Sequence, residues 1–396
     1  MTILLASPHR MPFLAGTVGL CGLALWWLVQ LYALHGGGPV PPQTQLPPAL
    51  LHGPAMIYAG FAPFIFGFLL TVFPRWMGQG DLPPKQFGPV GIALLAGVLT
   101  TLAGLWSGFD WLALAGFCLL AAGWAVAIVV LASVLRRNAL AARPRCWHAR
   151  SALGALCFGI AGIAAATGFL ASGDPALLAL ANRIGIGGLL LPIFLTVAHR
   201  MVPFFAGNVI ADYVRWRPDW LLAALWGLLL TRLAGEMLPF VALAVAANAG
   251  LAAVTGLMCW KWWPRTRPPG LLLVLVWGFT WAPPGFAFAA IDGALGLYGR
   301  GADHALMIGF AASLLVAMVT RVTQGHSGRP LEMPAVAWIA FGAIQAAAAS
   351  RIVAGVNAES GSWLIVAIFA FTLGLLPWAM RNGAIYVSPR RDGKDG

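Results

Sequence analysis

The sequence predicts an all-α membrane protein with about twelve transmembrane helices, and three observations lead to this prediction. Hydrophobic residues make up 60% of the chain and charged residues only 9%. The mean hydropathy of +0.84 leaves too little polar surface for a water-soluble fold. Apolar runs recur at the length of about 20 residues that a helix needs to cross a bilayer. Finally, the positive charges alternate in density from one loop to the next.

The apolar runs define the expected spans. They locate the ends of each span to within roughly two to four residues. The twelve runs lie near residues 12–34, 54–73, 88–106, 111–135, 151–171, 182–199, 219–234, 237–260, 271–290, 303–321, 334–354 and 362–380.

The distribution of lysine and arginine predicts the orientation of these spans. When successive loops are assigned to alternate sides, 20 of the 24 basic residues fall on the side that holds both termini. The positive-inside rule therefore places both termini in the cytoplasm. The net charge of +12 reflects this topology and the lipid bilayer, and it implies no nucleic-acid partner. The other side holds four arginines, which are Arg183, Arg232, Arg300 and Arg351.

The sequence argues against several common chemistries. It contains no GxxxxGK[ST], HExxH or GxSxG motif, which makes soluble nucleotide or hydrolase chemistry a poor interpretation. The twelve carboxylates lie at span ends, in loops or in the tails, so no intramembrane proton relay is predicted. The five cysteines form no CxxC pair and are interpreted as free thiols. Arg232 and Glu236 are interpreted as a surface ion pair at the outer end of a helix.

Prolines interrupt three of the expected spans. Pro63, Pro192 and the pair Pro283-Pro284 lie inside apolar runs. Proline breaks helical hydrogen bonding in a membrane only where neighbouring groups or a cavity satisfy the freed carbonyls. The Pro283-Pro284 pair is compatible with a broken helix, but a packed kink is the preferred interpretation.

The segment from Asp303 to Leu331 carries the clearest functional signal. His304 and Arg321 are separated by 17 residues, about 25 Å along a helix. This helix therefore carries a histidine at the outer membrane face and an arginine at the inner face. The predicted topology sorts six of the seven histidines into two layers: His35, His52 and His304 lie outside, and His9, His199 and His326 lie inside.

Layers of histidines from different helices are what a haem or metal site requires. Met56 follows His52 and Met307 follows His304 within one helical turn, and histidine with methionine suits haem or copper. The alternative is that these are ordinary interfacial histidines and apolar methionines. The inner histidines are accompanied by arginines that either bind propionates or phosphates or simply obey the positive-inside rule: Arg10, Arg200, Arg321 and Arg329.

A weak internal similarity links two of the expected spans. His52, Met56, Gly60 and Phe61 recur in the same order as His304, Met307, Gly309 and Phe310, but with different spacing. A second similarity, His9-Arg10-Met11 with His199-Arg200-Met201, lies at the inner ends of two spans. Because the spacings of the first similarity differ, a true internal repeat is not predicted.

These segments give the chain a resemblance to the NnrS family. The resemblance is carried by His199-Arg200-Met201-Val202-Pro203-Phe204-Phe205, by His304 to Arg321, by Gly325-His326-Ser327-Gly328-Arg329, and by the opening His9-Arg10-Met11-Pro12-Phe13. It implies one domain over residues 1–396, in the form of a twelve-span bacterial inner-membrane protein of the nitric-oxide response. It also implies haem b and copper as cofactors.

The chain departs from the family's pattern at the second span. The family's pattern His-x-His-Glu-Met is here His52-Gly53-Pro54-Ala55-Met56. If the missing histidine and glutamate serve a copper site or a proton path in the family, this chain lacks that part.

Two classes of function follow as expectations. The first is a haem-binding protein, with copper as a second metal, of nitric-oxide metabolism or nitrosative-stress defence. As an enzyme, it would be an oxidoreductase that reduces nitric oxide with electrons from quinol or a partner protein, and without turnover it would be a haem-based sensor. The second class is a membrane carrier for a metal, haem or small anion. The expected metal ligands are His52, His304, Met56 and Met307, and the other cofactor-binding residues are His9, His199, His326, Arg10, Arg200, Arg321 and Arg329.

Overall fold

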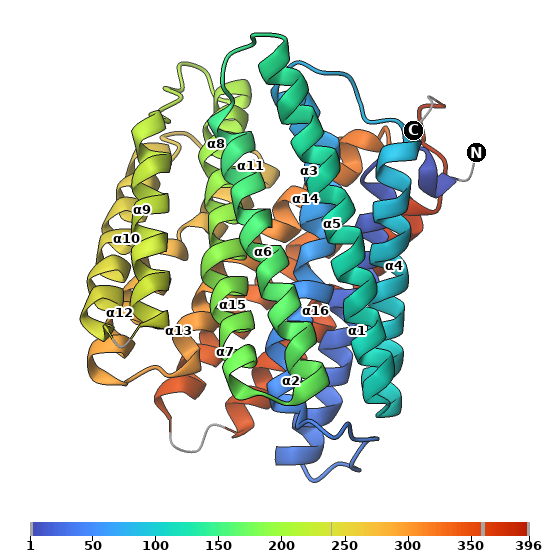
Figure 1. The fold of residues 1–396 in the computed structure, drawn as a ribbon. Coiled ribbons are helices and arrows are strands. Elements are labelled where there is room, and N and C mark those ends of the chain that lie inside the picture. The colour runs from blue at the N-terminus through green and yellow to red at the C-terminus, as the bar shows by residue number, and fades with distance from the viewer. Residues whose placement is uncertain (1–2, 239, 358–360, 394–396) are drawn as a thin grey trace. The chain divides into compact units, whose positions relative to one another are not determined.

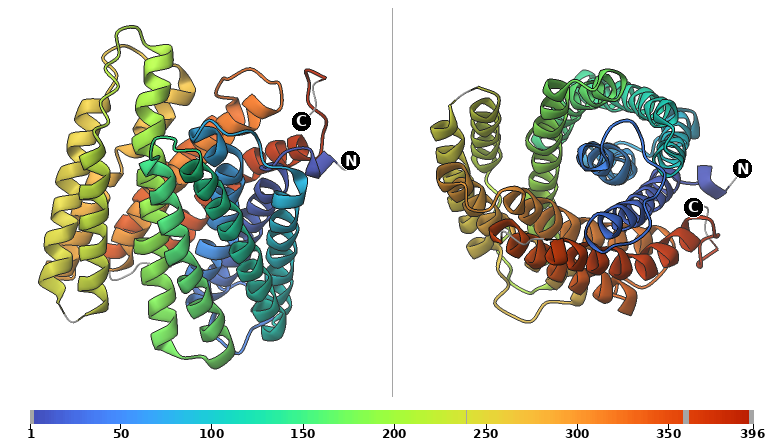
Figure 2. Two further views of the ribbon diagram at one scale, coloured as in Figure 1. Left: turned by 45° about the horizontal axis from the view of Figure 1, so that its top comes forward. Right: turned by 90° about the horizontal axis from the view of Figure 1, so that it is seen from below.

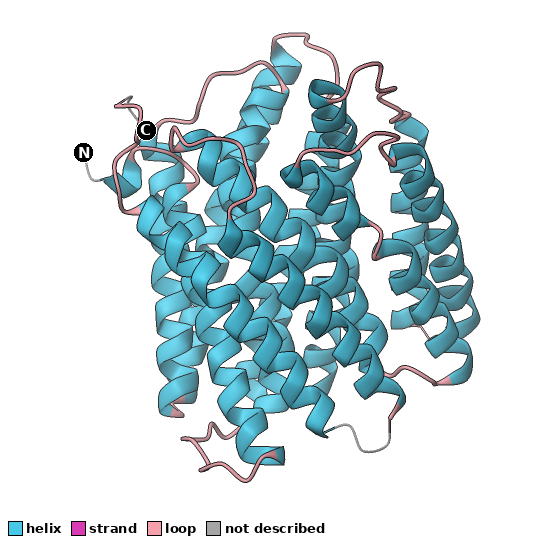
Figure 3. Cartoon of the chain, turned by 180° about the vertical axis from the view of Figure 1, so that it is seen from behind, coloured by secondary structure: helices cyan, strands magenta, loops and turns pink. Residues whose placement is uncertain are grey.

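The computed structural model describes residues 3–238, 240–357 and 361–393. Within these residues every regular element is a helix (Figure 3). Twelve helices are long and apolar enough to cross a membrane (Figure 1). The prediction of an all-α fold with about twelve spans is therefore confirmed, and the chain is a multi-pass membrane protein in contact with the lipid bilayer.

Eight spans are uninterrupted helices and four are built from two or three segments. The uninterrupted ones are α1 (Arg10–His35), α4 (Pro84–Ser107), α5 (Asp110–Leu140), α6 (Trp147–Ser172), α9 (Asp219–Met237), α10 (Val241–Trp262), α15 (Ala335–Val356) and α16 (Gly361–Tyr386). Span 2 consists of α2 (Pro48–Ala55), η2 (Met56–Phe61) and α3 (Ala62–Trp76). Span 6 consists of α7 (Pro175–Arg183), η3 (Ile184–Leu190) and α8 (Leu191–Val209). Span 9 consists of α11 (Gly270–Phe279) and α12 (Ala282–Leu295), and span 10 of α13 (Arg300–His304), η4 (Ala305–Ala312) and α14 (Ser313–His326). A short 3₁₀ turn, η1 (Ile3–Leu5), precedes α1.

Three of the composite spans contain a π-helical segment, and proline explains two of them. Pro63 and Pro192 lie directly after η2 and η3, near the start of α3 and α8. Proline has no N–H to give to the carbonyl four residues earlier, so the hydrogen bonding shifts to the wider π pattern. The π segment η4 of span 10 contains no proline. π turns inside α-helices are frequent at functional sites.

Span 9 agrees with the preferred interpretation of a kink. Thr280 and Trp281 separate α11 from α12, but both keep right-handed helical dihedral angles. Pro283 and Pro284 have no N–H to give to the carbonyls four residues earlier, so the helical hydrogen bonding is interrupted at this point. The chain therefore continues through the prolines as one span with a local interruption.

The described chain divides into two compact units that are interleaved in sequence. One unit contains Met1–Gly185, Val322–Pro330 and Ala379–Gly396, and the other contains Ile186–Arg321 and Leu331–Trp378. We call them unit 1 and unit 2 and describe each by itself. The prediction of a single domain over 1–396 stays a prediction.

Each unit has one span that is more buried than its neighbours. In unit 1 this is span 2, which is 89% buried and in contact with α1, α4 and α5 (Figure 2). In unit 2 it is span 10, which is 78% buried and whose η4 segment contacts α11, α12 and α15. These are the two spans with the recurring His–Met–Gly–Phe order, and in both of them this segment is π-helical. The similarity therefore marks a shared local structure in the most buried span of each unit.

The contact between α4 and α5 depends on small residues. A Cβ atom added to Gly116 of α5 would clash with the backbone nitrogen and the hydroxyl of Thr101 on α4. A Cβ on Gly104 would likewise meet the backbone of Ala113. Small residues allow this close approach of two helices, which is how membrane helices gain packing energy.

We expect Gly116→Leu to lower the thermal stability of the detergent-solubilised protein, by about 1–3 kcal/mol from overpacking. Gly227→Leu is the matched control, because no other atom lies within 4 Å of the added Cβ position. Thermal unfolding followed by tryptophan fluorescence measures both. Equal melting temperatures for the two variants would show that the α4–α5 approach is not tight.

Candidate functional site

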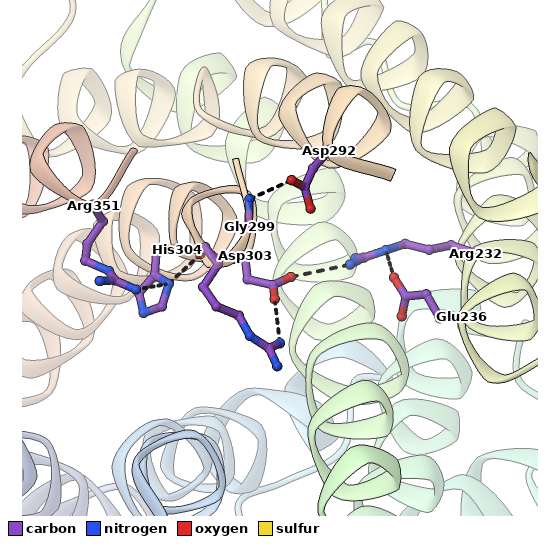
Figure 4. A network of polar contacts seen from close by, with 8 residues as sticks. Arg232, Glu236, Asp292, Gly299, Asp303, His304 and Arg351 are labelled. Atoms are coloured by element: carbon purple, nitrogen blue, oxygen red, sulfur yellow. Dashed lines mark hydrogen bonds and ion pairs between the residues drawn. The ribbon is translucent and has the colours of Figure 1, made fainter. Parts of the chain in front are cut away.

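The outer end of span 10 holds His304 in a defined orientation (Figure 4). Its Nδ1 lies 2.6 Å from the backbone carbonyl oxygen of Arg300. A carbonyl oxygen can only accept, so a hydrogen bond at this contact has its proton on Nδ1, and a neutral ring then has its lone pair on Nε2. Metal-binding histidines commonly have this arrangement, in which one nitrogen donates to a carbonyl and the other binds the metal.

A half-buried arginine lies beside this ring. The Nη2 of Arg351, on α15, is 3.2 Å from Nδ1 of His304. A guanidinium has only donors, and Nδ1 already uses its proton for Arg300. The Nε of Arg351 is buried without a hydrogen-bond partner, and within the described residues no carboxylate forms an ion pair with Arg351. A half-buried cation in this state is suited to an anionic group such as a propionate.

The residue before His304 anchors a second part of the network. Asp303 is 3.8 Å from Nη2 of Arg232 and 3.5 Å from Arg300. Arg232 also contacts Glu236 at 2.7 Å, and its own side chain is only 4% exposed. The prediction of a surface Arg232–Glu236 pair is therefore wrong, because the pair belongs to a partly buried network that holds α13 against α9. Asp292 adds to the surroundings by accepting hydrogen bonds from the backbone N–H groups of Tyr298 and Gly299.

Sequence reasoning missed Arg351 and Arg232 as site residues, although a signal for them was present. Three of the four arginines that break the positive-inside pattern gather around Asp303 and His304 in unit 2: Arg232, Arg300 and Arg351. A charge on the sparsely charged side of a membrane protein needs a specific reason. The arginines on the sparsely charged side therefore indicated the site better than the overall charge distribution did.

His52, which was also predicted as a metal ligand, has a different environment. In unit 1, the ring of His52 stacks on Trp27, with ring centroids 4.4 Å apart and planes 18° apart. Met56, four residues later, is the first residue of η2. Met307 lies three residues after His304, inside η4. A π-helical turn contains more residues than an α-helical turn, so a spacing of three residues falls further short of one full turn. The pair His52–Met56 therefore keeps a common helix face better than His304–Met307.

At the other end of unit 1, two predicted site histidines meet. The rings of His9 and His326 have centroids 4.9 Å apart and planes 49° apart. The Nδ1 of His9 is buried without a hydrogen-bond partner. Burial, His326 and nearby arginines (first Arg10, then Arg75 and Arg390) hold the pKa of His9 well below its usual range. His9 is therefore a neutral ring with a buried nitrogen available for a ligand.

Several arginines lie near this histidine pair and connect it with the C-terminal segment. Arg10 donates from Nη1 to the backbone oxygens of Tyr386 (3.1 Å) and Ser388 (2.7 Å), and its Nε is buried without a partner. Arg390 donates to the backbone oxygen of His326 at 3.1 Å and pairs with Asp392 at 2.6 Å. Burial, then Arg391, Arg381 and Arg10, lower the pKa of Arg329. This excess of positive charge favours an anion in the same region.

The spacing of His9 and His326 limits which group they can hold together. With metal–nitrogen bonds of about 2.0 Å, rings on opposite sides of one metal have centroids roughly 6 Å apart, and rings in neighbouring positions about 5 Å. The observed 4.9 Å fits neighbouring ligands of one ion and leaves no room for a porphyrin between the rings. Within the described residues, no group of three or more His, Cys, Asp or Glu side chains could hold a metal, so the pair is at most part of a ligand set.

The remaining predicted residues belong to unit 2. His199 is fully buried, and its Nε2 is 3.3 Å from the carbonyl oxygen of Pro218. Arg200 follows it on α8 and is half-buried. The guanidinium of Arg321 lies 3.8 Å from the ring centroid of Phe205, an ordinary cation–π contact. His199 and Arg321 thus contact different neighbours, Pro218 in the one case and Phe205 in the other.

The comparison with known families identifies the family of the chain. The family described as NnrS protein matches residues 3–390. The chain belongs to the NnrS family. No curated protein matches the sequence. Membership of the NnrS family suggests a role in the nitric-oxide response.

The departure from the NnrS pattern at the second span lies in a buried place. Pro54 and Ala55, which stand where the pattern has histidine and glutamate, are both buried on α2. In unit 1 the Cβ position of the adjacent Gly53 lies 2.8 Å from the side-chain oxygen of Asn182, which is itself buried without a partner. Two polar residues at these positions would face the interior of the unit. This chain therefore lacks two interior polar groups that the family pattern supplies.

The depressed pKa of His9 predicts how stability depends on pH in metal-free protein. Its unfolded-state pKa is about 6.5, and the folded state binds the proton more weakly. The contribution of His9 is therefore fully present above pH 6.5 and is lost as pH falls from about 6.5 toward the folded pKa, by at most about 1.4 kcal/mol per pH unit. His9→Gln should flatten this part of the stability curve of chelator-treated protein. An identical pH dependence in wild type and variant would show that His9 protonates equally in both states.

Proposed function

We propose that the protein is a haem-binding membrane protein of nitric-oxide metabolism or nitrosative-stress defence, in which His304 would bind the haem iron. The observation that carries this proposal is the 2.6 Å contact between Nδ1 of His304 and the carbonyl oxygen of Arg300. In a neutral ring that donates from Nδ1, the lone pair is on Nε2. Family membership supports the nitric-oxide role. The positive-inside distribution supports insertion in the bacterial cytoplasmic membrane with both termini inside.

The surrounding residues would orient and hold the cofactor. When bound, haem supplies an iron centre with a coordination position at which a small apolar gas can bind. Arg351 would meet a propionate, because its Nε is buried without a partner and its guanidinium has no carboxylate partner among the described residues. Asp303, held by Arg232 and Arg300, would fix the start of the short helix that presents His304. The apolar π segment that follows keeps bulk water from the site.

Nitric oxide suits such a site, because a small apolar molecule concentrates in lipid and reaches an intramembrane metal without a polar path. As an enzyme, the protein would reduce nitric oxide with electrons from quinol or a partner protein. Without an electron donor, the same site would bind or sense nitric oxide.

Copper is the second metal in the proposal, and two places compete for it. The inner pair His9–His326 has the spacing of neighbouring ligands of one ion. The outer pair His52–Met56 keeps the four-residue spacing of one helix face, with a histidine and a thioether that suit copper. His304 and Met307 were predicted together as well, but the π turn between them favours His304 alone.

A carrier for a metal, haem or small anion is the second candidate function. The observation that favours it is the interruption of four spans, by π segments in spans 2, 6 and 10 and by Thr280-Trp281 in span 9. Interrupted helices are typical of transporters, in which they form the substrate site.

The decisive test is a reduced-minus-oxidised absorbance spectrum of detergent-purified protein, with iron and copper measured in the same sample. Cells that make haem and take up copper are used for expression. We expect a b-type signal with iron in proportion to protein. Absence of both metals would mean that the histidines are structural, and transport assays for the carrier would then take precedence.

A further inference from the structure

The loop between α5 and α6 borders a cavity of about 730 Å³ in unit 1. This volume lies within the range of about 300–1,000 Å³ for small-molecule sites. The cavity is formed by the last turn of α5, the connecting loop and the first turns of α6. Four arginines line it, which are Arg136, Arg143, Arg145 and Arg150.

The charge of the cavity is not neutralised by the protein. No carboxylate lines it. Arg136 and Arg145 are exposed and form no hydrogen bond or ion pair with the described residues. Arg143 is fixed, because it donates to the backbone oxygens of Met77 (2.9 Å) and Gly78 (3.0 Å), and Arg150 lies over the ring of Trp147. Four cations around one cavity favour an anion and repel a headgroup that brings its own cation.

The cavity continues from the charged loop along an apolar wall. Leu153, Gly154 and Cys157 line it on α6. Cys157 is ten residues from the start of α6, about 15 Å along the helix, and its side chain is exposed. An exposed residue at that depth of a membrane span faces hydrocarbon. The ligand must therefore have a charged end and an apolar end.

A buried amide adds a requirement for a hydrogen-bond donor. Asn138, which lines the cavity and is only 5% exposed, donates from Nδ2 to the carbonyl of Pro144 at 3.2 Å. Its Oδ1 is buried and has no partner. Phosphate oxygens only accept when ionised, so this acceptor is matched by a hydroxyl elsewhere in the headgroup.

We propose that this α5–α6 cavity binds an anionic glycerophospholipid with a hydroxyl-bearing headgroup, of the phosphatidylglycerol type. The phosphate lies among the arginines, a headgroup hydroxyl donates to Asn138, and an acyl chain follows α6 past Gly154. The positive-inside distribution assigns this lipid to the cytoplasmic leaflet. The site is independent of the proposed haem site.

The test compares thermal unfolding of the full-length protein in micelles that contain phosphatidylglycerol, phosphatidylcholine or no phospholipid, and in micelles with inorganic phosphate. The variant is Arg136→Gln with Arg145→Gln, both exposed and without protein partners. The control is Arg137→Gln with Lys261→Gln, which removes the same charge from two exposed residues that do not line the cavity. We expect phosphatidylglycerol alone to raise the melting temperature of wild type and control, whereas the variant needs about tenfold more lipid or more.

A second measurement needs no variant. Phosphatidylglycerol should slow alkylation of the exposed Cys157 by N-ethylmaleimide, and the exposed Cys118, which does not line the cavity, is the internal reference. Equal stabilisation of wild type and variant, equal effects of both phospholipids, or unchanged labelling of Cys157 would each overturn the proposal. An effect of inorganic phosphate as large as that of the lipid would identify a free-anion site instead.

Discussion

His304→Ala is expected to remove haem from the purified protein, with a loss of at least about tenfold in the b-type absorbance per protein. Even substitutions of residues that only support a metal ligand typically cost about 10–100-fold in metal affinity, so loss of the ligand itself should cost no less. The measurement is the reduced-minus-oxidised spectrum at equal protein concentration. Added imidazole should restore part of the signal by occupying the space that the side chain leaves.

His35→Ala is the matched control for this prediction, because His35 is an exposed histidine at the predicted outer membrane face. It should leave the spectrum unchanged. A normal spectrum for His304→Ala, in protein that elutes as a folded species, would remove His304 as an axial ligand. The outer His52 would then be the next candidate.

Arg232→Met is expected to lower the free energy of unfolding by about 3 kcal/mol, the lower end of the range for breaking a buried ion pair. The side chain of Arg232 is 4% exposed, whereas those of Glu236 and Asp303 are 24% and 28% exposed and retain some water. Two carboxylates would lose their shared cation, and α13 would lose its link to α9. We expect haem retention to fall as well, because Asp303 directly precedes His304. Denaturant unfolding in detergent measures the first effect and the absorbance spectrum the second.

Arg300→Gln is the control for Arg232→Met. Arg300 contacts the same Asp303 at 3.5 Å, but its side chain is 79% exposed. Exposed ion pairs contribute at most about 1 kcal/mol, so this variant should unfold almost as the wild type does. If both variants lose equal stability, burial of Arg232 does not set the strength of the network.

The fold was predictable because membrane insertion imposes strong, local rules on the sequence. Span length and hydropathy identified all twelve spans, because a segment that crosses lipid must be apolar and must satisfy its own backbone hydrogen bonds as a helix. The same rules say little about the form of a helix within its span. The π segments at Met56–Phe61 and Ala305–Ala312 and the interruption at Thr280-Trp281 depend on local hydrogen bonding and packing.

The site was predictable in part. Histidines could be sorted by depth, and His9 and His326 do meet although 317 residues separate them in the sequence. The contacts of His304 were not predictable, because Arg351 and Arg232 approach it from α15 and α9 through tertiary packing. The four arginines on the sparsely charged side were the available signal. An exception to the positive-inside rule indicates a functional or buried charge, and three of these four meet at one site.

A titration with nitric oxide tests whether His304 holds a metal that binds this gas. Purified, haem-loaded and chemically reduced protein is titrated anaerobically with nitric oxide while the absorbance spectrum is recorded. The proposal predicts a saturable spectral change with one equivalent of nitric oxide per haem in the wild type. Haem-loaded wild-type protein whose reduced spectrum does not change with nitric oxide would contradict it.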